Sequence, residues 1–213
     1  MQALERAVLL ENFITILFVV ALSCLAMLKS INSEKLKGTI SSVFSAVFIE
    51  EETEANDSFF SAFNLILFVF SVLIISILFY ELSQRFSLIS DTGIFIFLKF
   101  FGIVLGYFSV KWFFEFLIKI LFLVKNEITF FLVSKSRSLY AISLGFFCIL
   151  ILTVYSSLTS YFLLYGSILF LFIRFLVIIV YNKNLILSKL FYFILYICAF
   201  EIAPLFVLFK LMF

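Results

Sequence analysis

The sequence contains no histidine, one proline, six glycines and few charged residues, which make up 13% of the chain. The absence of histidine removes the most common general base and the most common metal ligand of proteins. The three cysteines, Cys24, Cys148 and Cys198, lie far apart in separate apolar runs, so they predict neither a disulfide framework nor a zinc site. We therefore expect no catalytic residue, no metal and no cofactor.

Apolar residues dominate what is present: 65% of the 213 residues are hydrophobic, whereas soluble domains contain about 45–50%. Polar side chains this scarce cannot cover the surface of a globule, so much of the surface must face lipid. Phenylalanine occurs 34 times, and it suits a lipid-facing surface as any large apolar residue does. The sequence predicts an all-α integral membrane protein with a single membrane domain over residues 1–213.

Runs of about 20 mostly apolar residues, the length needed to cross a bilayer, recur along the chain. They predict six transmembrane helices, near residues 13–29, 60–80, 93–111, 139–158, 162–181 and 187–209. The first residues mix acidic and basic groups and lack the basic leader of a signal peptide, so we interpret the first apolar run as a span.

The connection at residues 30–58 is more than a plain loop. It begins with lysines, continues through a mildly apolar stretch and ends in an acidic run from Glu50 to Asp57. We interpret the acidic run as a solvated tip, with a calcium site or a partner site as the alternative.

Residues 112–133 are apolar enough to enter the membrane, yet they carry four charges. Lys111, Glu115 and Lys119 recur at steps of four, so they share one face of a helix and can pair along it. The pattern predicts an amphipathic helical segment that lies in the membrane interface, or a third helix that extends beyond the bilayer. A seventh span is the remaining alternative.

Lysine and arginine are distributed unequally over the two sides of the six-span topology. One side holds Lys29, Lys35, Lys37, Lys111, Lys119, Lys125, Lys135, Arg137, Lys183 and Lys189 in loops one, three and five. The opposite side holds Arg6, Arg85 and Lys210. The positive-inside rule then places both termini away from the cytoplasm, and a seventh span would invert the later half.

Three charged residues fall within predicted spans: Lys99, Arg174 and Glu201. An intramembrane charge costs about 2.5–3.5 kcal/mol on insertion scales, so such groups usually face the bundle interior and find a partner. Glu201 precedes Pro204, which is expected to bend the last helix. We expect an Arg174–Glu201 pair. Pairing with another group, in this chain or a partner chain, and a proton or ion pathway are the alternatives.

Gly102 and Gly106 form a GxxxG pattern in the third predicted helix. Such a pattern permits close approach of helices, and we interpret it as local packing. Lys99 stands one turn before it, where its side chain can reach the membrane interface or pair with Glu201.

The C-terminal stretch SKLFYFILYICAFEIAPLFVLFKLM, Ser188–Met212, resembles the end of a Bacteroidota membrane-protein family catalogued as domain of unknown function 4271. The stretch ENFITILF near the N-terminus and the pair Lys111 and Glu115 are similar to it as well. The likeness covers essentially the whole chain, and Glu201 and Pro204 are its most specific part. It implies the inner membrane of a Gram-negative-type envelope, and it implies no reaction, substrate or cofactor.

The missing catalytic residues and the charges available for pairing predict a non-catalytic subunit or accessory of an envelope assembly for secretion, gliding or surface assembly. Its partners would be the lipid bilayer and other membrane subunits or a second copy, and not nucleic acid. A small transporter or channel lined by Lys99, Arg174 and Glu201 is an alternative, although internal repeats are missing. A membrane enzyme acting on lipid or polyprenyl substrates is another, although it would need clustered acidic, histidine or metal-binding residues.

Overall fold

The chain forms helices joined by short connections, as expected when proline, the residue that most often breaks helices, first occurs at Pro204. The computed structural model describes residues 2–43, 45, 47–54, 61–86, 93–121, 126–156 and 160–183. Side chains are described there except at 2–12, 51–54, 114–121, 126–129 and 160. These ranges contain seven helices and no strand: α1 (Gln2–Ile31), α2 (Ser33–Ser41), α3 (Val47–Glu54), α4 (Ala62–Arg85), α5 (Ile94–Leu121), α6 (Asn126–Tyr155) and α7 (Ser160–Tyr181).

Five of these helices contain segments that are long and apolar enough to cross a membrane. The segments are Phe13–Ile31 in α1, Ala62–Arg85 in α4, Ile94–Phe113 in α5, Phe130–Tyr155 in α6 and Tyr161–Tyr181 in α7. The described part of the chain therefore has the predicted all-α class, and its long apolar helices are those of a multi-pass membrane protein. The sixth predicted span, at 187–209, lies outside the described residues, as do Glu201 and Pro204 within it.

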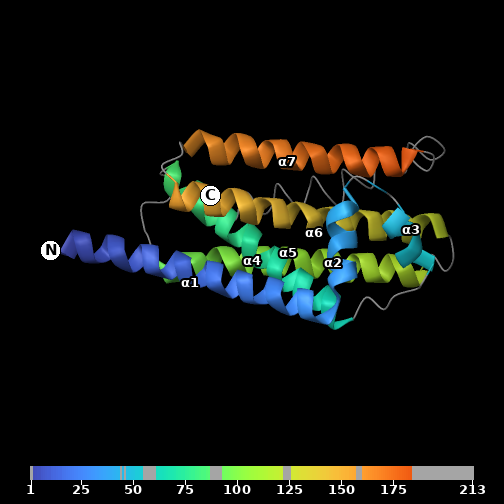
Figure 1. The fold of residues 1–213 in the computed structure, drawn as a ribbon, viewed down its shortest axis with the longest axis horizontal. Helices are drawn as coiled ribbons and strands as arrows, with labels where there is room; N and C mark the ends of the chain where they lie inside the picture. The colour runs from blue at the N-terminus through green and yellow to red at the C-terminus, as the bar shows by residue number, and fades with distance from the viewer. Residues whose placement is uncertain are drawn as a thin grey trace.

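The helices α1, α5, α6 and α7 run along the long axis of the molecule, α4 runs obliquely between them, and α2 crosses them steeply (Figure 1). The central helix is α4, which packs against α1, α5, α6 and α7. In its apolar segment 56% of the residues are buried inside the bundle, compared with 17% in α5 and in α7, so the described part of the chain leaves most of these two outer helices exposed. The helix α6 packs against α7 and is also contacted by α2 and α3.

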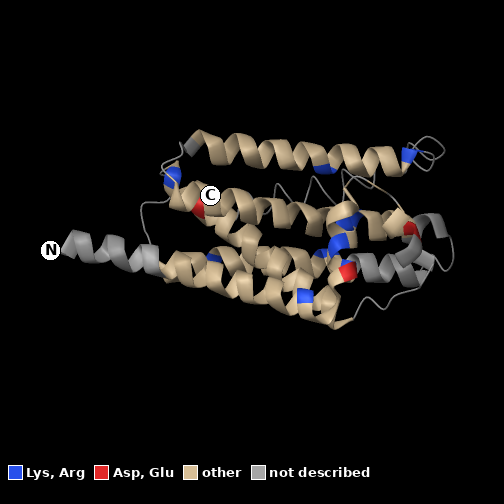
Figure 2. Cartoon of the chain, in the orientation of Figure 1, with Lys and Arg blue, Asp and Glu red and all other residues tan. Residues whose placement is uncertain are grey.

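Successive long helices run in opposite directions, so the ends of α1, α5 and α7 lie at the same end of the bundle as the starts of α4 and α6 (Figure 1). We call this end the basic end, because most of the lysines and arginines of the described part gather there (Figure 2). It is formed by the segments that carry Lys29, Lys35, Lys37, Lys111, Lys135, Arg137 and Lys183.

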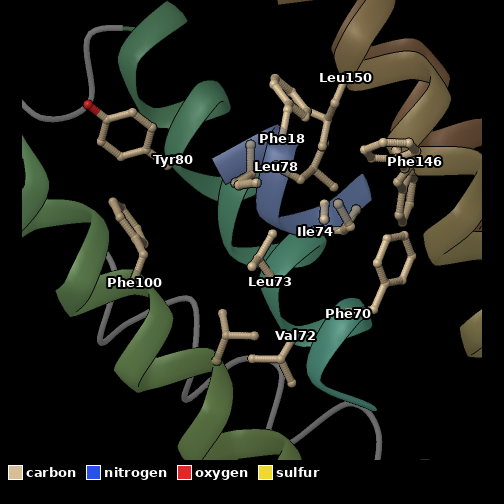
Figure 3. Close-up of a cluster of buried hydrophobic side chains, with 14 of the residues drawn as sticks. Phe18, Phe70, Val72, Leu73, Ile74, Leu78, Tyr80, Phe100, Phe146 and Leu150 are labelled. Carbon is tan, nitrogen blue, oxygen red and sulfur yellow. The ribbon is translucent and has the colours of Figure 1, made fainter. Parts of the chain in front are cut away.

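Aromatic rings connect the central helix to its neighbours (Figure 3). The ring centroid of Phe70 in α4 lies 5.8 Å from that of Phe147 in α6, and Phe18 of α1 lies 6.1 Å from the same ring. Tyr80 of α4 meets Phe97 of α5 edge to face at 6.1 Å. Edge-to-face pairs add about 0.5–1.5 kcal/mol beyond the area they bury. Phenylalanine therefore fills the interior of this bundle as well as its lipid-facing surface.

Polar residues fix where the shorter and central helices begin. Asn32 precedes α2, and its side-chain Oδ1 accepts a hydrogen bond from the backbone N–H of Lys35 at 2.9 Å. Ser61 precedes α4, and its Oγ accepts from the N–H of Asn64 at 3.3 Å. Both side chains satisfy N–H groups that have no acceptor within the first turn. Gly93 has a φ of 146°, which only glycine adopts readily, and α5 starts at the next residue.

The charged segment 112–133 is divided between two long helices. The helix α5 continues through Lys111 to Leu121, and α6 begins at Asn126, 13 residues before the predicted start of the fourth span at 139. The third helix is therefore longer than its predicted span, and its extension beyond the bilayer stays a prediction. Neither a separate interfacial helix nor a seventh span occurs in the described part of this segment.

Two glycines bring α6 and α7 close together. A Cβ atom at Gly145 of α6 would overlap the ring of Phe170 in α7. In the reverse direction, a Cβ at Gly166 of α7 would lie 3.0 Å from Cδ1 of Ile149 in α6. Small residues at such positions let transmembrane helices approach closely enough for extensive van der Waals contact.

Two buried serines join the middle of α4 to α6. Ser71 Oγ and Ser143 Oγ are 2.8 Å apart, and Ser143 Oγ also donates to the carbonyl of Tyr140 at 2.7 Å. A hydroxyl has only one proton, so Ser71 is the donor to Ser143 when Ser143 donates to Tyr140.

Replacing Ser71 by alanine is expected to lower the free energy of unfolding by about 0.6 kcal/mol, a typical value for such bonds between membrane helices. The measurement is reversible unfolding in mixed detergent micelles. Ser23→Ala is the control, because the Ser23 hydroxyl is exposed and donates to a carbonyl of its own helix, Val20 O, at 2.7 Å. Equal losses for the two variants would contradict a bridging role of the serine pair.

Candidate functional site

A cleft at the basic end is lined by cations from three different helices. They are Lys111 of α5, Lys135 of α6 and Arg174 of α7. None of the described residues that line this cleft is acidic. The sequence predicted Arg174 as an intramembrane charge and Lys111 as part of a charged face, and the fold brings them to one place. We call it the basic cleft.

Aromatic side chains make up much of the rest of the basic cleft. Trp112 follows Lys111 directly, whereas Tyr140 and Phe108 lie five and three residues from the lysine of their own helix, toward the middle of the bundle. Phe68 of α4 completes the aromatic lining. The rings of Phe68 and Phe108 meet edge to face, with centroids 6.4 Å apart. The cleft therefore combines cationic and aromatic side chains from four helices.

The SKSRS stretch of α6, which the sequence placed in a loop, is buried among the helices. Lys135 is 2% exposed and Arg137 is 4% exposed. Nη2 of Arg137 donates to Oδ1 of Asn64 in α4 at 2.7 Å, and its guanidinium lies over the ring of Tyr140, 5.9 Å from the centroid. Fully buried lysine and arginine are rare in proteins, which is why the sequence-based prediction placed both residues in a loop. They are the main residues of this region whose burial the prediction missed.

A second polar contact ties the end of α7 to the same stretch. The side chain of Asn182 is buried, and its Nδ2 donates to Oγ of Ser134 at 3.5 Å and to the carbonyl of Ile178 at 2.9 Å. Together with the Arg137–Asn64 bond, this contact holds α4, α6 and α7 in fixed positions around the basic cleft.

The predicted charged face on α5 comprises Lys111, Glu115 and Lys119, and of these the structure describes the side chain of Lys111. It is half-buried, and its Nζ lies 6.0 Å from the centroid of the Tyr107 ring. The side chains of Glu115 and Lys119 lie outside the described residues, although α5 itself extends past both positions. The expected pairing along this face therefore stays a prediction.

The predicted intramembrane charges do not meet at one place. Lys99 is exposed and precedes Lys111 by 12 residues on α5, which is about 18 Å along a helix. Arg174 lines the basic cleft with Lys111, so Lys99 and Arg174 lie at different depths. Glu201 is outside the described residues, and the Arg174–Glu201 pair stays a prediction.

The predicted packing of Gly102 and Gly106 is not made within the described part of the chain. Both residues are exposed, and a Cβ atom at either would meet nothing within 4 Å. They lie on one face of α5 with the exposed residues Phe95, Lys99 and Ser109, which recur every three or four positions. We call this surface the glycine face.

At the opposite end of the bundle, Arg85 forms an ion pair within α4 and a hydrogen bond to α6. Arg85 Nε lies 3.2 Å from Glu81 Oε2, and their side chains are 20% and 10% exposed. Arg85 Nη2 also donates to the carbonyl of Thr153 at 2.7 Å. That carbonyl belongs to the last turn of α6, where backbone acceptors lack helical donors and the helix dipole favours a cation.

No group of three or more Cys, Asp or Glu side chains suited to a metal ion occurs among the described residues. Cations that converge in a region of low dielectric attract anions more strongly than the same cations in water. The basic cleft is therefore suited to hold a negatively charged group, either a carboxylate of this chain or a bound anion.

The comparisons with known proteins give one result. A family model described as a domain of unknown function (DUF4271) matches residues 14–212. No curated protein and no solved structure matches the chain.

Proposed function

The chain belongs to the domain of unknown function 4271 family, and from this premise we propose that it is a non-catalytic subunit of a membrane assembly, joined to its partner through the glycine face of α5. The partner is a transmembrane helix of another subunit. A role in the envelope of a Bacteroidota cell, in secretion, gliding or surface assembly, is part of the proposal. So are an inner-membrane location and termini that face away from the cytoplasm.

The observation that supports this proposal is the exposure of Gly102 and Gly106 on an outer helix. Large side chains make a better lipid-facing surface than glycine, and glycine weakens a helix by about 1 kcal/mol relative to alanine. The lipid-facing side of α7 follows this expectation, with exposed residues such as Tyr165, Leu169 and Phe172. Two glycines one turn apart on the lipid-facing side of α5 instead leave a shallow groove that another helix backbone can enter.

Lys99 adds a charged group to the glycine face, so a partner helix can make a polar contact there in addition to close backbone packing. It is exposed one turn before Gly102 on the same face, and a cation on a lipid-facing helix is costly unless it reaches the interface or a partner. A carboxylate on the approaching helix would supply that partner. We therefore expect a partner helix with small residues facing Gly102 and Gly106 and an acidic residue near Lys99.

Replacing both Gly102 and Gly106 by leucine is expected to weaken association about tenfold or more, because the side chains fill the groove that the partner backbone enters. The measurement is the dissociation constant of the complex in mild detergent, followed by chemical crosslinking from native membranes. A Cβ atom added at either position has no neighbouring atom within 4 Å, so the variant is expected to fold normally.

Ala26→Leu is the matched control, because Ala26 is also a small exposed residue on a membrane helix. It is expected to leave association unchanged. Formation of a complex between differently tagged copies would identify the partner as a second copy of this chain. A wild-type protein that is monomeric and crosslinks to nothing would contradict the proposal, as would full association of the double variant.

A further inference from the structure

We propose that Lys99 makes the glycine face selective for a helix of a different protein, one that carries a carboxylate level with Lys99, and against a second copy of this chain. The inference rests on the proposed function, because it concerns the same surface of α5. It adds the class of partner and names the residue that selects it.

Lys99 lies inside the membrane segment of α5 and on the same face as the two glycines. The helix begins at Ile94, directly after Gly93, so Lys99 is five residues from its start, which is about 8 Å along the axis. Gly102 follows three residues later, about one turn on. A helix that packs into the groove at Gly102 and Gly106 therefore passes beside Lys99.

The described part of the bundle supplies no carboxylate for the ammonium group of Lys99. Its side chain is exposed. Glu81, the one acidic residue in the described membrane segments, is buried and pairs with Arg85. A lysine at this position is costly unless it reaches the interface or an anion. A helix that covers the groove also covers part of the route from Lys99 to water, so a stable complex needs a carboxylate on that helix.

A second copy of the chain brings the wrong charge to this surface. Two copies with the same orientation in one membrane are related by a twofold axis along the membrane normal, and a twofold dimer uses the same patch on both subunits. With Gly102 and Gly106 at the contact, Lys99 of one copy lies near Lys99 of the other, on helices whose axes are about 8 Å apart. These like charges repel more strongly in a low dielectric than in water.

A helix with an aspartate or glutamate at this level replaces the repulsion by an attraction. The carboxylate is itself costly in the bilayer, so each of the two charged groups stabilises the other. Small residues on the partner let the two backbones approach, and the ion pair then adds to the van der Waals contact. The partner is therefore a transmembrane helix with two small residues four positions apart and an acidic residue about one turn from them.

The test uses designed polyleucine transmembrane peptides with two glycines four positions apart and a Glu, Gln or Lys one turn from them. The variable residue precedes the first glycine in one set and follows the second in another, which covers parallel and antiparallel docking. Binding to the purified full chain is measured by resonance energy transfer in phosphatidylcholine vesicles, at a mildly alkaline pH that ionises the carboxylate. The Glu peptide is expected to bind about tenfold more tightly than the Gln peptide, and the Lys peptide least tightly.

Variants of the chain show whether Lys99 is the residue that selects. Lys99→Glu is expected to reverse the order, so that the Lys peptide binds most tightly. Lys29→Glu is the matched control and should leave the order unchanged, because Lys29 is also an exposed lysine on a membrane helix but lies outside the glycine face. Lys99→Leu is expected to bind the Glu and Gln peptides equally and to associate with itself. Adding Gly102→Leu and Gly106→Leu should abolish that self-association.

The results separate this inference from the proposed function. Equal binding of the Glu and Gln peptides to the wild type, lost in the Gly102→Leu, Gly106→Leu variant, would keep the glycine face as a docking surface and overturn the role of Lys99. Binding of no peptide would contradict both. Self-association of the wild-type chain that is lost in Glu201→Gln would overturn the inference, because a second copy would then supply the carboxylate. Thermal unfolding in detergent micelles checks that each variant is folded.

Discussion

Replacing Gly145 by leucine is expected to lower the free energy of unfolding by about 3 kcal/mol, the upper part of the range for overpacked interiors. Even a Cβ atom at this position overlaps the ring of Phe170. That ring also packs against Phe146, with centroids 5.7 Å apart, which restricts its movement. A leucine side chain therefore forces α6 and α7 apart. The change is measured by reversible unfolding in mixed micelles and by the loss of helical circular dichroism on heating.

A graded series separates overpacking from a general effect of removing glycine. Gly145→Ala is expected to cost less than Gly145→Leu, because a small shift of the Phe170 ring accommodates one methyl group. Gly102→Leu is the matched control, since Gly102 is a glycine in a neighbouring span with open space around it. In the double variant with Phe170→Ala, part of the stability lost in Gly145→Leu should return. A full loss in the Gly102→Leu control would contradict the explanation.

Replacing Arg85 by methionine is expected to lower the free energy of unfolding by about 2–4 kcal/mol. The change removes two charge-assisted hydrogen bonds, one to Glu81 and one to the carbonyl of Thr153. It also leaves the carboxylate of Glu81, whose side chain is 10% exposed, without its cation. An uncompensated buried charge is the larger part of the expected loss. The same unfolding measurement gives its size.

Two further variants divide this effect between its causes. Arg85→Lys keeps the charge but loses the planar group that contacts two acceptors at once, so an intermediate loss is expected. The double variant Glu81→Gln, Arg85→Met removes the buried charge as well as its partner. It should be more stable than Arg85→Met alone. If the double variant is the less stable of the two, desolvation of Glu81 is not the cause.

The helical membrane class could be predicted from composition, because no soluble fold can hide so many apolar residues. The apolar runs also located α4 and α7 within a few residues, since both helices coincide with long, mostly apolar segments. The prediction was wrong at the start of α6. Lys135 and Arg137 suggested a loop, because isolated charges are expected in water, whereas the fold buries them and starts the helix at Asn126.

The candidate site was only partly visible in the sequence. Arg174 and Lys111 were singled out by their surroundings, but their meeting in one cleft depends on how α5, α6 and α7 pack. A local signal for the buried cations did exist: serines alternate with them at positions 134, 136 and 138. Small polar residues leave room for long side chains between helices. The partners of those cations, such as Asn64, are some 70 positions away along the chain and could not be identified from spacing.

The central position of α4 has a consequence for synthesis, because a chain is inserted from its N-terminus and α4 enters the membrane before α6 exists. Its buried polar groups are suited to this order. The hydroxyls of Ser76 and Ser83 bond to carbonyls of α4 itself, and Glu81 pairs with Arg85 within the same helix. Asn64, Ser71 and the second bond of Arg85 wait for α6. The helix can thus lie in lipid as a nearly self-sufficient unit and become the centre of the bundle when its later neighbour arrives.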